Sequence, residues 1–179
     1  LKENFGCEKF KPNQEKIINC ILSRKDTSAI MPTGGGKSIC FQLPALIFPG
    51  ITIVISPLIA LMKDQVDSLK ANGIAACFIN SSQSSEEQEF YIQNLKDNKI
   101  KLVYVAPESL SFLENAFSQI TISLIAIDEA HCISAWGHDF RPAYTNLGYL
   151  KNRFPSTPIL ALTATADKAT RTDISEQLN

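Results

Sequence analysis

A glycine-rich segment has the residue types and the spacing of a phosphate-binding loop. Residues 31–38 read Met-Pro-Thr-Gly-Gly-Gly-Lys-Ser and stand between an apolar run and a helical pattern. Glycines let backbone N–H groups turn toward phosphate oxygens, and the start of a helix favours anions. Lys37 can reach the β- and γ-phosphates of a nucleotide, and the Ser38 hydroxyl can bind Mg²⁺. Because Met31 replaces the first glycine of the strict pattern, a glycine-rich turn with a chance Gly-Lys-Ser is the alternative.

Two carboxylates follow another apolar run. Residues 124–127 are Leu-Ile-Ala-Ile, and Asp128 and Glu129 come directly after them. An Asp at the carboxyl end of a strand beside a phosphate loop is placed to hold Mg²⁺, directly or through water. A neighbouring Glu can orient and deprotonate an attacking water. An Asp-Glu pair that begins a helix is the alternative, but the phosphate loop upstream favours nucleotide hydrolysis.

The segment after the acidic pair has the side chains to bind a nucleic acid. Trp136 and Phe140 offer faces on which any base can stack, whatever the base sequence. His138 and Arg141 add hydrogen-bond donors for phosphate. The alternative is that both aromatic side chains pack in the core. Their glycine and polar neighbours favour an exposed loop.

Six short apolar runs predict the strands that must position these residues. They are rich in Ile, Val and Leu and lack polar alternation, which is typical of parallel strands covered on both faces. The runs are 28–31, 51–56, 76–80, 101–106, 124–128 and 159–165. Helical patterns alternate with them at 13–23, 37–47, 58–71, 84–98 and 168–178. We therefore predict a doubly wound α/β domain with a mostly parallel central sheet, helices on both faces and ligands at the carboxyl ends of the strands.

Side-chain patterns within the helices add local predictions. Ser84, with Glu87 three residues later, forms a capping box, and Asp167 is placed to cap the last helix. The helix at 58–71 is expected to place five apolar side chains on one face. They are Leu58, Leu61, Met62, Val66 and Leu69.

Composition limits the class of protein. The 179 residues include 17 Lys and Arg and 18 Asp and Glu, for a net charge of −1, and 45% are hydrophobic. These values exclude a disordered chain, a collagen-like chain and a basic tail, although a local patch can still bind nucleic acid. The five cysteines form no C-x-x-C pair, so we expect reduced, mostly buried thiols rather than a zinc ribbon. Prolines interrupt the uncharged stretch 38–62, so no membrane span is expected.

Together these motifs resemble those of superfamily 2 helicases. Asp128-Glu129-Ala130-His131 is the DEAH form of the superfamily's box, and residues 33–38 fit its looser phosphate loop, which accounts for Met31. Three further segments look like its motifs Ia, Ib and III: 56–65, 106–108 and 163–165.

The resemblance narrows to the RecQ family of DNA helicases and covers nearly the whole chain. Residues 132–142 are similar to that family's aromatic-rich loop, which senses single-stranded DNA and signals to the ATP site. Residues 5–14 resemble its motif 0, in which the residue matching Gln14 reads adenine. The resemblance implies a RecA-like P-loop NTPase domain, the first motor lobe of an ATP-dependent 3′–5′ DNA helicase of repair and recombination. The partners it implies are ATP, Mg²⁺, and single-stranded and duplex DNA.

The same resemblance implies a role for each motif residue. The catalytic residues would be Glu129, Lys37 and Asp128. The ATP-binding residues would be Gln14, Lys11, Thr33, Gly34, Gly35, Gly36, Lys37 and Ser38. Mg²⁺ would be held by Ser38 and Asp128. DNA binding or coupling would involve Trp136, His138, Phe140, Arg141, His131, Thr163 and Thr165. His131 is expected to link the ATP site by hydrogen bond to Thr163 or Thr165.

Two residues of motif 0 depart from the family pattern. Cys7 stands where the family has Tyr or another aromatic residue, and Lys11 stands where it has Arg. An aromatic ring would stack on adenine, and Arg can fork or stack where Lys cannot. We therefore expect the departures to weaken adenine selectivity and to leave phosphate binding intact.

The family completes its ATP site with arginines from a second lobe and adds zinc-binding and winged-helix regions. None of these parts follows Thr165, and the chain begins at Leu1, so we expect 1–179 to be one lobe of a longer protein. Alone, it should bind nucleotide weakly and hydrolyse it poorly. The expected location is the bacterial cytoplasm with its nucleoid, or the nucleus in a eukaryote. An RNA helicase or RNA-dependent ATPase, or a non-enzymatic module that binds nucleotide or DNA, remains the alternative.

Overall fold

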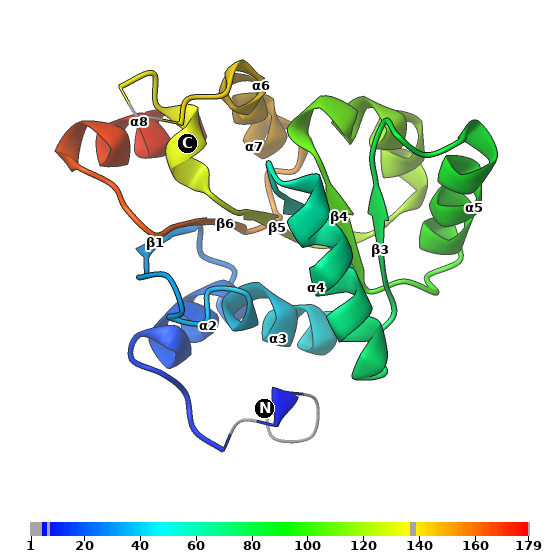
Figure 1. The fold of residues 1–179 in the computed structure, drawn as a ribbon, viewed down its shortest axis with the longest axis horizontal. Coiled ribbons are helices and arrows are strands. Elements are labelled where there is room, and N and C mark those ends of the chain that lie inside the picture. Colours follow the sequence, from blue (N-terminus) through cyan, green and yellow to red (C-terminus); the bar gives the residue numbers. More distant parts are fainter. Residues whose placement is uncertain (1–4, 7, 137–138, 179) are drawn as a thin grey trace.

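A six-stranded parallel sheet forms the centre of the molecule (Figure 1). The computed structural model describes residues 5–6, 8–136 and 139–178. The spatial order is β1-β6-β5-β2-β4-β3, and all five pairings of neighbouring strands are parallel. The strands are β1 Thr27–Ile30, β2 Ile51–Ile55, β3 Ala76–Ile79, β4 Leu102–Val105, β5 Ile122–Ile127 and β6 Ile159–Thr163.

Helices cover both faces of the sheet, and a separate hydrophobic cluster lies under each layer. One layer contains α2 Gln14–Leu22, α3 Ile39–Ile47 and α4 Ile59–Ala71. The other contains α5 Ser85–Lys96, α6 Pro142–Thr145, α7 Tyr149–Arg153, α8 Lys168–Leu178 and the 3₁₀ segments η1 Pro107–Gln119, η2 Ala130–Ile133 and η3 Asn146–Gly148. In Figure 1, α2 and α3 lie below the sheet and α6, α7 and α8 above it. The predicted α/β class is confirmed.

The six predicted strands all form, each within two residues of its expected bounds. Full burial is confirmed for β2, β4, β5 and β6, but it is wrong for β1. Only Ala29 of β1 is buried, whereas Ser28 and Ile30 are exposed. In the described part of the chain β1 is an edge strand paired with β6, whereas β3, at the other edge, is covered by α4 and α5 and stays almost fully buried.

The five predicted helices form, and both predicted caps are present. Ser84 Oγ accepts a hydrogen bond from the Glu87 backbone N–H (3.2 Å), and a Glu87 carboxylate oxygen accepts one from the Ser84 N–H (3.0 Å). Asp167 Oδ1 accepts from the Thr170 N–H (2.8 Å) at the start of α8. Helix α3 begins at Ile39, two residues later than predicted, because Lys37 and Ser38 still belong to the loop.

The predicted apolar face of α4 is only partly buried. Met62, Val66 and Leu69 lie in the core, but Leu58 and Leu61 are 46% and 38% exposed. The prediction is wrong for these two because residues 56–58 form a short turn between β2 and α4. The first turn of α4 therefore lies at the carboxyl edge of the sheet. An apolar surface therefore lies next to the motifs described below.

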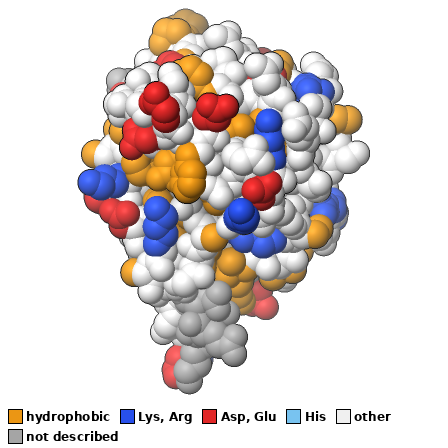
Figure 2. Space-filling view, turned by 90° about the vertical axis from the view of Figure 1, so that its right-hand side faces the viewer, with side chains coloured by type: hydrophobic (Ala, Val, Ile, Leu, Met, Phe, Trp, Pro, Cys, Tyr) orange, Lys and Arg blue, Asp and Glu red, His pale blue; other side chains and the backbone are white. Residues whose placement is uncertain are grey.

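The surface and the thiols agree with the composition. Figure 2 looks onto the side that α5 occupies, where acidic and basic side chains alternate around a cluster of hydrophobic ones. Phe90 of α5 is 64% exposed.

The cysteines that the structure describes are all free: Cys40, Cys77 and Cys132 are buried and Cys20 is half-buried, whereas Cys7 lies outside the described residues. Within the described ranges, no helix has the length and apolar character to cross a membrane.

Candidate active site

The sheet order brings the predicted motifs to one edge. The phosphate loop follows β1, the acidic pair follows β5, and Thr163 ends β6, which lies between those two strands. The backbone N–H of Met31 donates to the Thr163 carbonyl (2.9 Å) and extends this pairing by one residue. Parallel strands end at the same edge, so motifs that are far apart in the sequence become neighbours.

The phosphate loop has the backbone that its glycines predict. Gly34 and Gly36 have φ of 78° and 77°, in the left-handed region that favours glycine. A Cβ on Gly36 would overlap the end of the Gln14 side chain, so a larger residue there would displace the Gln14 amide. Met31 is buried, and its Sδ lies 3.7 Å from Cys40 Sγ. It fills the core instead of facing the loop, which explains how the first glycine of the strict pattern can be absent.

Both described motif 0 candidates contact this loop. Lys11 Nζ donates to the Gly34 carbonyl (2.8 Å), and Gln14 Nε2 donates to the Gly36 carbonyl (3.0 Å). The Lys11 backbone N–H in turn donates to Gln14 Oε1 (2.7 Å), which fixes the orientation of the amide. Gln14 is buried although it is polar, and these contacts satisfy it. The structure thus places Lys11 and Gln14 beside the loop, together with the exposed Thr33.

Glu129 is held between two cationic or donor side chains. Its carboxylate lies 3.2 Å from Lys37 Nζ and 3.3 Å from His131 Nδ1. Its backbone has φ 50° and ψ 44°, a left-handed conformation that costs a non-glycine residue about 1–3 kcal/mol. Such strain persists where the surrounding contacts impose it, and here it turns the carboxylate from the end of β5 toward the phosphate loop.

His131 joins this carboxylate to the end of β6, as predicted. His131 Nδ1 lies 2.9 Å from Thr163 Oγ1, and Thr163 Oγ1 donates its proton to the Thr165 carbonyl (2.9 Å). The hydroxyl must then accept from the imidazole, so Nδ1 carries the proton. Thr163 is therefore the side-chain partner, whereas Thr165 contributes its backbone carbonyl and its own side chain makes no described contact with His131.

Asp128 is a buried carboxylate at the same edge. Its Oδ1 accepts from the Glu129 backbone N–H (3.0 Å), and Tyr144 OH donates to its backbone carbonyl (3.0 Å). Burial and then the charge of Glu129 raise the pKa of Asp128, and Lys37 opposes the shift. A nearby cation would stabilise the charged form of Asp128 and lower its pKa, which fits a carboxylate that binds a metal ion.

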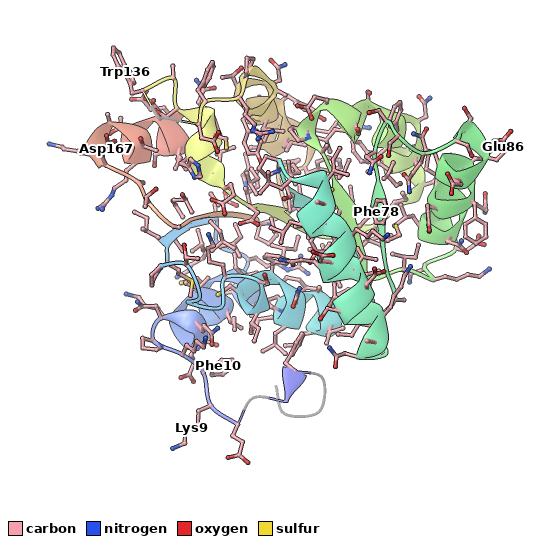
Figure 3. The ribbon with its side chains drawn as sticks, in the orientation of Figure 1. Lys9, Phe10, Phe78, Glu86, Trp136 and Asp167 are labelled. Carbon is pink, nitrogen blue, oxygen red and sulfur yellow. The ribbon has the colours of Figure 1, made fainter. Side chains whose placement is uncertain are left out.

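The two aromatic side chains of the segment 132–142, here called the aromatic segment, are exposed, so the alternative that they pack in the core is wrong. Trp136 is 81% and Phe140 40% exposed, and Figure 3 shows Trp136 projecting beyond α8, away from the sheet. Arg141 Nη1 donates to the Pro57 carbonyl (3.1 Å), so one of its predicted phosphate donors is engaged at the start of α4. His138 lies outside the described residues, and its predicted role stays a prediction.

Two contacts at the site involve residues that the sequence did not single out as site residues. Asp139 Oδ2 lies 3.8 Å from His131 Nε2, which connects the aromatic segment directly to the DEAH box. Gln65 Nε2 donates to Ser38 Oγ (3.1 Å) from across the gap between α4 and the phosphate loop. Gln65 stands within the motif Ia segment, but its spacing from residues 31–38 carries no signal of contact.

The sequence pattern of the DEAD/DEAH box helicases matches residues 11–174. The chain belongs to this family. It is 55% identical to the ATP-dependent DNA helicase RecQ of Haemophilus influenzae and 51% identical to that of Bacillus subtilis, in both cases over its whole length. It spans only 29% and 31% of these relatives. The predicted resemblance to RecQ helicases is confirmed.

A solved structure supports the fold of this DEAD/DEAH box domain. The helicase domain of Hef from Pyrococcus furiosus superimposes with a TM-score of 0.68 over 94% of this chain and 36% of its own. The two sequences are 18% identical, so the likeness concerns the fold alone. It confirms the predicted RecA-like arrangement of the sheet and helices.

The oxygen atoms at the site of this helicase-family domain fit Mg²⁺. Ser38 offers a hydroxyl and Asp128 a carboxylate, and Mg²⁺ prefers such oxygen ligands. A different set, His131, Cys132 and Asp139, brings nitrogen, sulfur and oxygen within 4.8 Å of one another. Burial raises the pKa of the Cys132 thiol to about 11, which keeps it protonated and disfavours a thiolate–metal bond.

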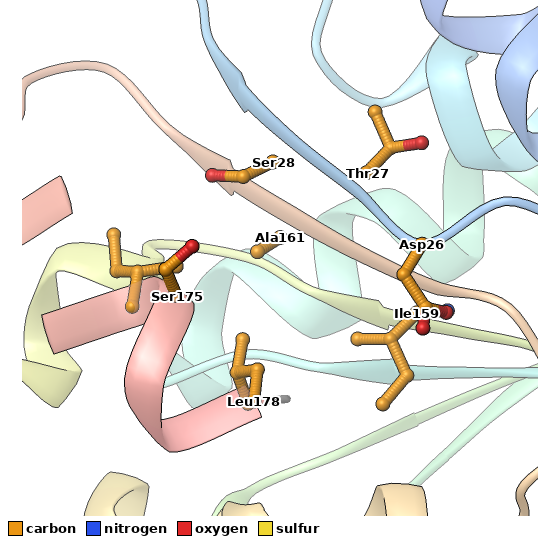
Figure 4. A pocket seen from close by; sticks show the side chains of 8 residues that line it. Asp26, Thr27, Ser28, Ile159, Ala161, Ser175 and Leu178 are labelled. Atoms are coloured by element: carbon orange, nitrogen blue, oxygen red, sulfur yellow. The ribbon is translucent and has the colours of Figure 1, made fainter. Parts of the chain in front are cut away.

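A pocket elsewhere in the DEAD/DEAH box domain does not belong to the site. It lies between β1, β6 and α8 (Figure 4) and is lined by Asp26, Thr27, Ser28, Ile159, Ala161, Ile174, Ser175 and Leu178. Its volume of about 110 Å³ is well below the roughly 300–1,000 Å³ of pockets that hold ligands of nucleotide size. None of the predicted site residues lines it.

The raised pKa of Asp128 predicts how pH affects the domain without nucleotide. The folded chain holds this proton more tightly than the unfolded chain, so the free energy of unfolding falls as pH rises from the ordinary Asp pKa through the raised one. Asp128→Asn removes the buried charge. At pH 8 we expect this variant to melt above wild type, and each 1 kcal/mol of stability gained would raise the melting temperature by roughly 2–4 °C at this size.

Thermal unfolding at two pH values provides the control. Below about pH 4, where an ordinary Asp is protonated, the gain of Asp128→Asn should vanish. Asp64→Asn makes the same change at an exposed position of α4 and should be neutral at both pH values. A melting temperature of Asp128→Asn below that of wild type at pH 8 would show that the carboxylate stabilises the free domain.

Proposed function

We propose that this chain is the ATP-binding motor lobe of a RecQ-type, 3′–5′ DNA helicase. Residues 1–179 would form a single RecA-like domain, and a second lobe of the same parent chain would complete the ATP site. The RecQ relatives are named as ATP-dependent DNA helicases and support the activity. The observation that carries the proposal is the Glu129 carboxylate, held by Lys37 and His131 at the end of β5.

The contacts of Glu129 suggest how hydrolysis would proceed. Lys37 can exchange the Glu129 carboxylate for a phosphate oxygen, because both partners are anions. The exchange leaves one carboxylate oxygen of Glu129 as acceptor for the proton of an attacking water. His131 still lies beside the other oxygen, since its contact with Glu129 does not involve Lys37. Glu129 therefore keeps its orientation while it becomes available as a base.

Nucleotide binding would rest on the loop and its neighbours. Backbone N–H groups of the loop and Lys37 would bind phosphate oxygens, and Lys11 and Gln14 would lie beside the nucleotide. Ser38 and Asp128 would hold Mg²⁺, which supplies positive charge against the phosphates when bound. The departures at Lys11 and Cys7 would weaken the selectivity for adenine and leave the binding of the phosphates intact.

The aromatic segment would report bound DNA to this site. Trp136 and Phe140 present exposed faces for bases, and Asp139 of the same segment contacts His131. A base that stacks on the segment would shift Asp139, and the shift would reach Glu129 through His131. This connection gives a physical basis for hydrolysis that depends on DNA.

Trp136→Ala in the full-length parent protein tests the DNA role. Stacking of a base on an aromatic side chain is worth roughly 1–3 kcal/mol, so the single-stranded DNA concentration for half-maximal ATPase should rise roughly 5- to 150-fold. ATPase without DNA should change little, because Trp136 does not touch Lys37 or Glu129. The measurement is a titration of ATPase with single-stranded DNA and, in parallel, with RNA of the same sequence.

Phe90→Ala is the matched control, because Phe90 is another exposed aromatic side chain and lies on α5, which packs against β3 at the opposite edge of the sheet from β1. It should leave the titration unchanged. Stimulation by RNA at lower concentration than by DNA would favour the RNA helicase of the same superfamily. Stimulation by DNA that does not depend on Trp136 would remove the segment from the DNA-binding surface.

A further inference from the structure

A polar network joins α3, α4 and β4 behind the phosphate loop. Tyr104 OH donates to Gln65 Oε1 (2.9 Å), and Gln42 Nε2 donates to Tyr104 OH (3.1 Å) and to Gln65 Oε1 (3.3 Å). Gln65 Nε2 then donates to Ser38 Oγ (3.1 Å). Gln42 and Tyr104 are buried, whereas Gln65 and Ser38 are half-buried at the site.

The network fixes which end of the Gln65 amide faces the site. The oxygen of a carboxamide only accepts hydrogen bonds, and its nitrogen only donates. Two donors, Tyr104 OH and Gln42 Nε2, converge on Gln65 Oε1, so the amide oxygen must point to them. The NH₂ group is thereby directed at Ser38. A flipped amide would place its NH₂ group against the Gln42 NH₂ group, and buried donors without acceptors are costly.

A donor from Gln65 sets the direction of the Ser38 hydroxyl. A serine Oγ has two lone pairs and one proton. If Gln65 Nε2 occupies one lone pair, the other lone pair and the proton remain for the site. The free lone pair can bind a metal ion, and the proton can be donated to an anion. Without Gln65, the hydroxyl could rotate and donate its proton into the network instead.

We propose that Gln65 is a positioning residue that orients the Ser38 hydroxyl for Mg²⁺, with Tyr104 and Gln42 holding Gln65 in place. The inference rests on the proposed function, because it assumes that Ser38 binds Mg²⁺. A role in packing alone would not need this polarity. A leucine of similar size would fill the space, and a buried polar network stabilises a fold only when every member is satisfied.

The test uses Gln65→Leu in the full-length parent protein and measures binding of a fluorescent ATP analogue. In EDTA, affinity should stay within about twofold of wild type, because the substitution changes neither the glycines of the loop nor Lys37. In a Mg²⁺ titration, the Mg²⁺ concentration for half-maximal enhancement of binding should rise roughly 2- to 13-fold, the range for one hydrogen bond of ordinary net strength. Tyr104→Phe keeps the ring and removes the hydroxyl, and it should shift the titration the same way by less.

A double variant separates positioning from packing. If Gln65 acts through Ser38, Gln65→Leu should add nothing to the Mg²⁺ response of Ser38→Ala. Gln93→Leu makes the same change on α5, where the exposed Gln93 donates to Asp97 Oδ1, and should match wild type. Thermal unfolding of every variant checks that it folds. If Gln65→Leu does not fold, the Mg²⁺ titration of Tyr104→Phe provides the test.

Three outcomes overturn the inference. An unchanged Mg²⁺ titration in Gln65→Leu and Tyr104→Phe removes Gln65 from the positioning of Ser38. Equal weakening with and without Mg²⁺ assigns Gln65 to the stability of the loop. Wild-type binding that does not respond to Mg²⁺ at all contradicts the proposed function itself, and the inference falls with it. The first two outcomes leave the proposed function intact.

Discussion

Replacing Glu129 by glutamine in the parent protein is expected to lower the rate of ATP hydrolysis by roughly 10²- to 10⁴-fold, the usual contribution of a general base. The amide keeps the size of the side chain and can still lie beside His131, so the left-handed backbone at this residue should persist. It cannot take a proton from water. Nucleotide affinity should be unchanged or higher, because Lys37 loses an anionic partner that competes with phosphate.

Single-turnover hydrolysis and equilibrium binding, measured side by side, check this expectation. Glu89→Gln makes the same change at an exposed position of α5 and should behave as wild type. Hydrolysis by Glu129→Gln at the wild-type rate would show that another group takes the proton. Equal loss of binding and hydrolysis would instead mean that Glu129 supports the loop, not the chemistry.

The second large effect concerns the proposed second lobe. We expect residues 1–179 alone to hydrolyse ATP roughly 10³- to 10⁵-fold more slowly than the parent protein, the factor that an arginine finger contributes in related phosphoryl transfer. The basic residue nearest the end of the chain, Arg171, is exposed on α8, and its Nε donates to the Ala166 carbonyl. It is therefore not directed at the acidic pair.

Steady-state ATPase of the chain and of the parent, with and without single-stranded DNA, measures this difference. Circular dichroism and thermal unfolding verify that the isolated chain is folded, and Asp128→Asn serves as a blank for contaminating ATPase. Strong DNA-stimulated turnover by the 179 residues alone would show that the site needs no arginine from a second lobe.

Buried apolar runs made most of the fold predictable. β2, β4, β5 and β6 are covered on both faces, so their sequences are continuously apolar and their bounds follow from the sequence. The exposure of β1 could not be predicted, because burial of an edge strand depends on how fully the helices cover it, and β3 at the other edge is almost fully buried. The short helices between β5 and β6 and the 3₁₀ segment η1 lack a sustained period and were missed.

The site was predictable where chemistry restricts the residue type. Few residue types can replace the glycines with positive φ, the lysine and serine after them, or the two carboxylates after a strand. The structure gathers these residues at one edge of the sheet. The hydrogen bond between His131 and Thr163 was also expected. Gln65 and Asp139 were not, because a polar side chain on a helix or loop shows no local sign of its distant partner. Only the packing of α4 and of the aromatic segment brings them into contact.

Strand separation by the full-length parent protein tests the central claim most directly. The substrate is a DNA duplex with a single-stranded tail at its 3′ or its 5′ end, with ATP and Mg²⁺ present. The account predicts that the wild type separates the 3′-tailed duplex and not the 5′-tailed one, and that Glu129→Gln separates neither. Separation that persists in Glu129→Gln, or that needs a 5′ tail, would contradict it.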